Sequence, residues 1–227
     1  MKRSADLGGR VVRPPTNEHR LGTRGHPEES RAAILQAAVA EFAEHGIAGA
    51  RTDAIARAAH VNKALLYYYF KDKDALYEAV LDHVFSGLRA RVMPVLESKL
   101  RPRQKMLEYL GAYFDYIAAN PRFPRVVQGE WMRSGAKGNA RMQRVAKKYF
   151  RPIFERLAGV LREGIEAGEF RAVNAMDFVP SVVGVIIFYF SAAPLMKTLV
   201  KVDPLSEKRI RERRAFVLDF ISAALFR

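Results

Sequence analysis

Apolar side chains recur at helical spacing along most of this chain, and no long stretch alternates at the period of two that strands show. The first clear apolar stripe consists of Ile34, Leu35, Ala38, Val39 and Phe42. It follows Pro27, which suits a first helical turn, and stops at Gly46, which suits a left-handed cap. The pattern therefore predicts an all-α protein whose first helix begins near Pro27.

Two short helices with a tight turn between them are predicted for residues 51–73. Thr52 is expected to cap the first helix, because its hydroxyl can accept a bond from a free amide of the first turn. Asn62 is expected to cap the second helix, residues 63–69, in the same way.

The second short helix has two distinct faces. Val61 and Leu65 are four residues apart and are expected to pack inward. The opposite face carries four polar or amphipathic side chains and no acidic one: Asn62, Lys63, Tyr67 and Tyr68. A short helix that presents such a face beside a crossing helix has the geometry of a helix-turn-helix, in which the second helix enters the major groove of DNA.

The string T-x-x-x-I-A-x-x-A-x-V-N-K-x-x-L-Y-Y-Y-F-K-x-K, from Thr52 to Lys73, resembles the DNA-binding signature of the TetR (tetracycline repressor) family. Its L-Y-x-Y-F-K-x-K tail is the most specific part. The resemblance covers residues 27–85, and beyond them it is one of length and helix pattern. His60 stands where the family usually has Gly, and Leu65 where a smaller residue is common. Because His tolerates the left-handed region, the turn is expected to form, and the departures bear on operator preference.

The resemblance implies a double-stranded DNA operator of roughly palindromic sequence, bound by a dimer. The DNA-binding residues are expected to be Arg51, Thr52, Asn62, Lys63, Tyr67, Tyr68 and Lys73. Hydroxyl and ammonium groups bind phosphates without reading sequence, which is the role expected of Thr52, Tyr67, Tyr68 and Lys73. Asn62 and Lys63 head the second helix and are expected to approach base edges.

Helical stripes continue to the C-terminal end of the sequence. A long helix from about Asp74 to Met93, with Phe85 and Leu88 on its apolar stripe, is expected to link the two halves, and Pro94 to end or kink it. Further helices are predicted at about 101–119, 126–133, 140–167 with a kink or break at Pro152, 178–196 and 204–225. The chain is thus divided into a disordered basic arm (1–26), a helix-turn-helix domain (27–73) and a ligand-binding and dimerisation domain (74–227).

No charged residue occurs from Phe178 to Met196, which is long enough to suggest a transmembrane helix. Pro180 and Pro194 interrupt the run, so a helix buried on several sides is the preferred interpretation. The last predicted helix also carries an apolar stripe, which must be buried against another element. Both helices are expected to form a two-fold interface that resembles the four-helix dimer interface of the family. The expected interface residues are Val182, Ile186, Phe216, Phe220 and Ile221.

The net charge of +14 and the pI of about 10.2 favour a polyanionic partner. The absence of cysteine excludes disulfides and thiol catalysis and fits a reducing cytoplasm. Much of the positive excess lies in residues 99–156 rather than in the helix-turn-helix. It indicates either a solvated basic face, which we prefer, or a site for an acidic ligand or more nucleic acid. The arm at residues 1–26 likewise either contacts phosphates or is a solvated tail.

Catalytic and metal-binding patterns do not occur in the sequence. No two histidines have the spacing of a metal site, and no nucleophile elbow, P-loop or dinucleotide-binding glycine pattern is present. Neither an enzyme nor a cofactor is therefore expected.

Aromatic residues crowd the second half of the chain, where the resemblance implies a small-molecule cavity. Aromatic walls with few polar groups suit an apolar or aromatic ligand. Tyr113, Trp131, Tyr149 and Phe178 lie on different predicted helices and are the candidates for ligand contact. The main hypothesis is a ligand-responsive transcriptional repressor, and the alternative is a constitutive DNA-binding or architectural protein without an effector. The length of the second half favours the first hypothesis.

Overall fold

The computed structural model describes residues 27–134 and 140–227, so the basic arm expected over residues 1–26 lies outside the described ranges. Within these ranges the chain is helical, as its periodicity predicted. Apart from turns and connections, the only other secondary structure in these ranges is an isolated antiparallel bridge between Phe170 and Phe226.

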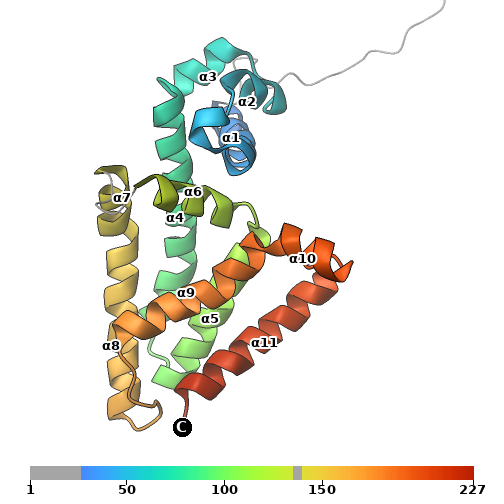
Figure 1. Ribbon diagram of the computed structural model, residues 1–227. Coiled ribbons are helices and arrows are strands. Elements are labelled where there is room, and N and C mark those ends of the chain that lie inside the picture. The colour runs from blue at the N-terminus through green and yellow to red at the C-terminus, as the bar shows by residue number, and fades with distance from the viewer. Residues whose placement is uncertain (1–26, 135–139) are drawn as a thin grey trace, which may run out of the picture.

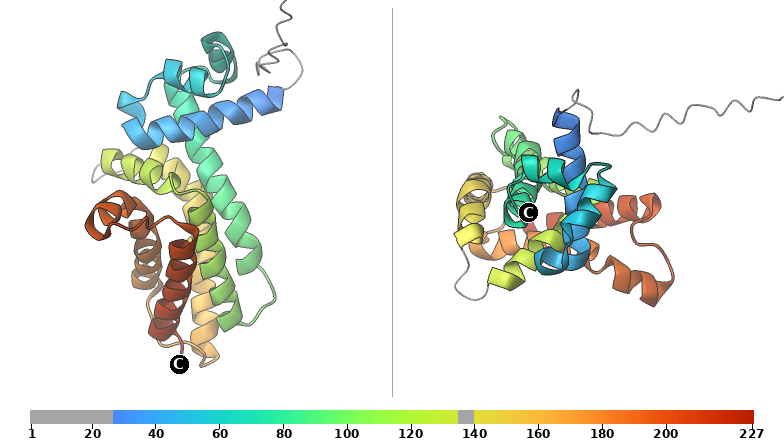
Figure 2. Two further views of the ribbon diagram at one scale, coloured as in Figure 1. Left: turned by 90° about the vertical axis from the view of Figure 1, so that its right-hand side faces the viewer. Right: turned by 90° about the horizontal axis from the view of Figure 1, so that it is seen from above.

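A three-helix unit forms one end of the molecule, and a long helix leads from it into the rest of the chain (Figure 1). These elements are α1 (Pro27–Gly49), α2 (Thr52–Ala58), α3 (Lys63–Tyr69) and α4 (Lys73–Leu96). The elements that follow are α5 (Pro102–Ala119), α6 (Phe123–Ser134), α7 (Ala140–Val145), the π-helical segment η1 (Ala146–Phe150), α8 (Arg151–Glu166), α9 (Ala175–Ser191), α10 (Ala193–Val200) and α11 (Glu207–Leu225). α4, α5 and α8 pack against one another, α6 lies across α4 below α1, and α9 and α11 pack on α5 (Figure 2).

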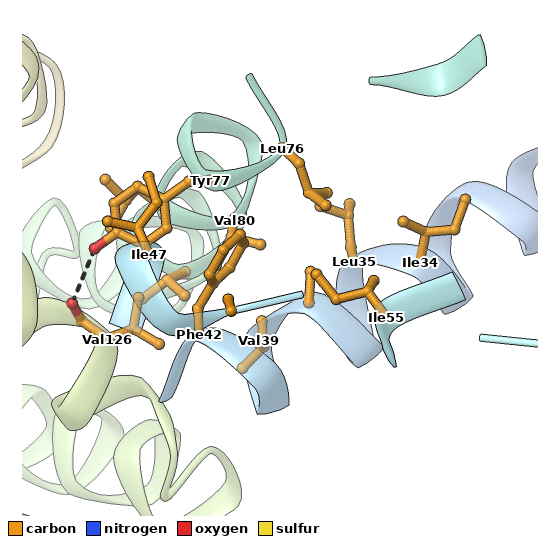
Figure 3. Packing of buried hydrophobic residues seen from close by; sticks show 14 of the residues in the cluster. Ile34, Leu35, Val39, Phe42, Ile47, Ile55, Leu76, Tyr77, Val80 and Val126 are labelled. Carbon is orange, nitrogen blue, oxygen red and sulfur yellow. Dashed lines mark hydrogen bonds between the residues drawn. The ribbon is translucent and has the colours of Figure 1, made fainter. Parts of the chain in front are cut away.

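Two hydrophobic cores meet along α4. The first core joins α1, α2, α3 and the first half of α4 to α6, and Figure 3 shows part of it. The Tyr77 hydroxyl donates to the Val126 carbonyl at 3.4 Å and so ties α4 to α6 inside this core. The second core includes Val92 and draws on α5, α8, α9 and α11. α4 therefore belongs to both halves, and a domain boundary at residues 73/74 would cut the first core.

The turn of the helix-turn-helix forms as expected, but one cap differs. Asn62 Oδ1 accepts a hydrogen bond from the Leu65 amide at 2.7 Å, and His60 takes the left-handed conformation with φ of 55°. Thr52 was expected to cap α2. Arg51 occupies the cap position instead, with no side-chain capping bond, and Thr52 is the first helical residue.

The inward face of α3 lies one residue away from the predicted one. Leu66 is fully buried and Phe70 is buried one turn later, whereas Val61 and Leu65 are only partly buried. Leu66 and Phe70 are four residues apart and reach the same core. Val61 packs against this core as predicted, whereas Leu66 takes the place predicted for Leu65.

Prolines set the breaks in the later helices. Pro152 lies in the first turn of α8, directly after the π-helical turn of η1. The proline lacks an amide hydrogen and its ring crowds the preceding turn, so the wider π turn accommodates it. Pro194 begins α10, which is bent by 60° from α9, whereas Pro94 lies within the last turn of α4.

The described ranges contain no single helix that is both long enough and apolar enough to cross a membrane. α9 and α10 reach that length and composition only together, across their bend of 60°.

Candidate nucleic-acid interface and ligand cavity

The outer surface of α3 lies at the end of the molecule farthest from the C-terminal end of α11 (Figure 1). Asn62, Lys63, Tyr67 and Tyr68 are exposed there, and Tyr68 leaves 80% of its surface in solvent. Arg51 is exposed before α2. The expected DNA-binding residues therefore share one surface, with the partial exceptions of Thr52 and Lys73.

Two side-chain contacts fix α3 against α2. The Thr52 and Tyr67 hydroxyls lie 3.1 Å apart, and Lys63 Nζ lies 2.9 Å from Asp53 Oδ1. The hydrogen bond between Lys63 and Asp53 raises the pKa of Lys63 and lowers that of Asp53. The two helices are thus held together, and the Lys63 ammonium is already paired with Asp53.

The Lys73 ammonium is not free to bind a phosphate with all of its donors, because it is bonded to the backbone. Its Nζ donates to the Ala48 and Ala50 carbonyls at 3.3 and 3.2 Å. These carbonyls belong to the end of α1 and the connection that follows, where backbone acceptors lack helical partners. Lys73 therefore joins the start of α4 to the start of the helix-turn-helix, and two of its three donors are occupied.

Part of the positive excess in residues 99–156, within 141–148, packs along an acidic edge of α4. Arg141, Arg144 and Lys148 pair with Asp74, Glu78 and Asp82. The corresponding nitrogen–oxygen distances are 2.9, 2.6 and 2.6 Å. We call these three pairs the charge ladder. Its basic side chains are neutralised by α4, which disfavours the acidic-ligand and additional nucleic-acid interpretations.

A fully buried carboxylate adjoins the charge ladder. Glu130 of α6 lies 3.2 Å from Arg133 Nη2 and 3.8 Å from Arg141 Nη1. Arg141 therefore connects α7 to α6 as well as to α4. In the same part of the chain, the hydrogen bond that Lys148 donates to Asp82 raises the pKa of Lys148 to about 12.

An apolar cavity of about 240 Å³ lies between α4, α5, α6, α8 and α9. Its lining includes Leu88, Tyr109, Tyr113, Phe123, Trp131, Ile153, Val179 and Ile187, and none of the lining residues within 27–134 and 140–227 is charged. Trp131 and Pro180 are exposed members of the lining and mark its solvent side. A cavity of this kind binds an organic molecule rather than an ion.

Two of the four predicted ligand-contacting residues line this cavity, namely Tyr113 and Trp131. Tyr149 does not, because its ring stacks on Phe85 and its hydroxyl donates to Asp82. Phe178 does not either, because it lies in a groove between α9 and α11.

The neighbours Phe150 and Val179 line the cavity in place of Tyr149 and Phe178. Tyr109 and Tyr116 were also missed, although they share the 109/113/116 spacing of one face of α5 with Tyr113. That aromatic spacing was the available signal.

The exposed apolar surface of α9 and α11 includes Phe188, Phe216 and Phe220. The rings of Phe216 and Phe220 stack with centroids 5.8 Å apart, and about half of each side chain is exposed. Val182, Ile186 and Ile221, also predicted as interface residues, are buried in the second core of the same chain. They cannot reach a partner, because α9 and α11 use that stripe to pack on each other and on α5.

Arg213 sits at the edge of this surface. Its guanidinium lies over the rings of Tyr189 and Phe216, at 4.9 and 5.1 Å from their centroids, and Nη2 donates to the Val185 carbonyl. Its buried Nε has no hydrogen-bond partner among the described residues. Desolvation lowers the pKa of Arg213.

Two family models match the chain. Residues 34–80 match the model of bacterial regulatory proteins of the tetR family, and residues 102–221 match a tetracyclin repressor-like C-terminal domain. The first match covers the helix-turn-helix and the first part of α4. The second covers α5, α6, α8 and α9, which enclose the cavity together with α4, and the helices that carry the exposed phenylalanines.

Relatives and solved structures agree with these matches. The HTH-type transcriptional repressor SCO4008 of Streptomyces coelicolor is 36% identical over 142 residues, 63% of this chain and 68% of that protein. The HTH-type transcriptional repressor NicS of Pseudomonas putida is 28% identical over 205 residues, 86% of this chain and 90% of that protein.

The hemolysin II transcriptional regulator HlyIIR has a similar structure, with a TM-score of 0.66, 26% identity and coverage of 88% of this chain and 99% of that one. The ketosteroid transcriptional regulator KstR2 of Mycobacterium tuberculosis has a TM-score of 0.72 at 19% identity, over 87% of this chain and 95% of that one, which shows a shared fold. The chain belongs to the TetR family of DNA-binding transcriptional regulators.

Proposed function

We propose that this regulator is a homodimeric repressor that binds a roughly palindromic operator and responds to a small apolar effector. The observation that carries the proposal is the uncharged cavity against α4, the helix on which the helix-turn-helix unit is mounted. Because its target is bacterial operator DNA, the proposal places the protein in the cytoplasm.

DNA contact is assigned to the exposed surface of α3 and the residues around it. Tyr67, Tyr68, Thr52 and Arg51 hold phosphates, while Lys63 and Asn62 at the start of α3 approach base edges. The Asn62 side-chain oxygen is occupied as a cap, so its amide group is the part free to donate. Lys73 acts by positioning α4.

Dimerisation is assigned to the exposed apolar surface of α9 and α11. Phe188, Phe216 and Phe220 form its centre, and aromatic anchors of this kind dominate protein interfaces. A two-fold axis there pairs the same surface on both subunits and matches the symmetry of a palindromic operator.

Adjacent residues of α11 test this surface. Phe220→Asp should give a folded monomer, because it places a charge on an exposed surface. Ile221→Asp should unfold the chain, because it buries an unpaired carboxylate in the second core. Sedimentation gives the assembly state and circular dichroism the fold. A Phe220→Asp protein that stays dimeric would place the interface elsewhere.

The switch is assigned to α4. Val84, Phe85 and Leu88 of α4 line the cavity, so a ligand that fills it favours one position of this helix. α4 sets the separation of the two recognition helices in a dimer, and half-sites on duplex DNA tolerate little change in that separation. A typical coupling of about 1–3 kcal/mol changes operator affinity by roughly 5–150-fold.

Leu88→Ala tests the switch. It removes cavity wall on α4 and should leave DNA binding without ligand largely intact while reducing the effect of ligand on it. Operator affinity is measured with and without a ligand found by thermal shift, on DNA selected by the protein from a random pool. A ligand that binds in the cavity and leaves operator affinity unchanged would favour a constitutive DNA-binding protein.

A further inference from the structure

Two neighbouring tyrosines of α5, each with a polar hydroxyl, belong to the wall that this helix contributes to the apolar cavity. Tyr109 and Tyr113 lie one turn apart on α5, are 3% and 6% exposed, and stack with ring centroids 6.1 Å apart. Neither hydroxyl has a hydrogen bond to any residue that the structure describes, and neither oxygen is a fully buried atom. Tyr116, on the next turn, differs because its hydroxyl donates to the Val84 carbonyl at 2.7 Å.

A phenol enclosed in an apolar cavity without a partner is unfavourable, and a ligand atom that accepts its proton relieves that cost. Burial raises the pKa of Tyr109 and of Tyr113 well above the usual range. Both phenols therefore remain protonated near neutral pH and are able to donate.

Charge complementarity argues against an ionic ligand. Among the described residues the lining carries no charge, so a carboxylate or ammonium group would lose its hydration there without gaining a counter-ion from them. The cavity volume of about 240 Å³ also lies below the usual volume of ligand pockets, which is about 300–1,000 Å³. A long chain or a ligand that carries a phosphate does not fit these walls.

We propose that the cavity selects a small uncharged molecule with an apolar body and one hydrogen-bond acceptor, such as a ketone carbonyl, that accepts from Tyr109 or Tyr113. The inference rests on the proposed function only in taking this cavity as the effector site. It adds the chemical class of the ligand.

Three probes of similar size separate the possibilities: acetophenone, ethylbenzene and benzoate. Trp131 is the one tryptophan in the sequence and lines the cavity, so its fluorescence reports occupancy directly. Acetophenone should bind about tenfold more tightly than ethylbenzene, which corresponds to one good hydrogen bond. Benzoate should bind more weakly than either.

Tyr109→Phe and Tyr113→Phe identify the donor. If one tyrosine is the donor, its Phe variant should lose the preference for acetophenone over ethylbenzene and keep its affinity for ethylbenzene. If both donate, the double variant should show this loss. Tyr116→Phe is the matched control, because its hydroxyl is already used by Val84, and it should keep the preference. Melting temperatures of all variants check that the fold is intact.

The inference is overturned if benzoate binds best, if none of the probes binds, or if the double variant keeps the preference. Failure of the proposed function has a different signature. Acetophenone would then bind with the expected preference, and operator affinity would not respond to it.

Discussion

The two halves of α4 are held in different ways. Its first half, beside the DNA-binding unit, has an exposed edge held by the charge ladder and by the Lys73 bonds to α1. Its second half is packed in apolar surroundings and borders the cavity. Exposed ion pairs are weak and exchange easily, whereas packed apolar contacts resist deformation. We infer that a ligand acts on the half that borders the cavity and that the exposed ion pairs along the first half rearrange in response.

The largest effect is expected on the free energy of unfolding, when a residue on the buried face of α4 is replaced. Leu81 is almost fully buried, and Leu81→Ala should lower the free energy of unfolding by about 2–5 kcal/mol, because it leaves a cavity in the first core. Urea unfolding measures the change. A loss below about 1 kcal/mol would show that α4 is less firmly packed than its burial indicates.

A smaller effect is expected at the start of α4. Lys73→Ala should cost about 1–2 kcal/mol of stability, because it leaves the Ala48 and Ala50 carbonyls without their donor. Arg51→Ala is the comparison on the DNA surface, because exposed Arg51 is assigned to a phosphate. It should reduce the salt dependence of operator binding by about one phosphate contact, while Lys73→Ala keeps that slope. If Lys73→Ala lowered the salt dependence and the comparison variant did not, Lys73 would be the phosphate ligand.

The smallest effect is expected from a single pair of the charge ladder. Arg144 and Glu78 are both substantially exposed, so Arg144→Ala should change stability by no more than about 1 kcal/mol. The difference between the variant and the parent should shrink further at high salt, because screening weakens exposed pairs. Unfolding at two salt concentrations tests this, and a large salt-independent loss would make the ladder a rigid element.

Local signals made the DNA-binding unit predictable. The Asn62 cap, the left-handed His60 and the exposed surface of α3 depend on residues close together in the sequence. Periodicity also identified most of the helices and the change at Pro152, but the helix predicted at 178–196 runs across the 60° bend between α9 and α10. Thr52 as a cap and Leu65 as an inward residue were errors of one position.

The cavity could be predicted only in part, because α4, α5, α6, η1, α8 and α9 all contribute to it. Which face of each helix turns toward it depends on tertiary packing. The π turn of η1 changes the direction of successive side chains, so that Phe150 rather than Tyr149 reaches the cavity. On α11 both Phe220 and Ile221 are apolar, and the sequence does not show which one packs inside the chain.

The coupling between cavity and operator is tested most directly by one titration carried out twice. Acetophenone is added to the wild-type protein with and without a saturating amount of selected operator DNA, and Trp131 fluorescence reports binding. If α4 links the two sites, the two affinities should differ by roughly 5–150-fold, because coupling between sites is reciprocal. Equal affinities would contradict the account, since a ligand that binds both states equally shifts neither.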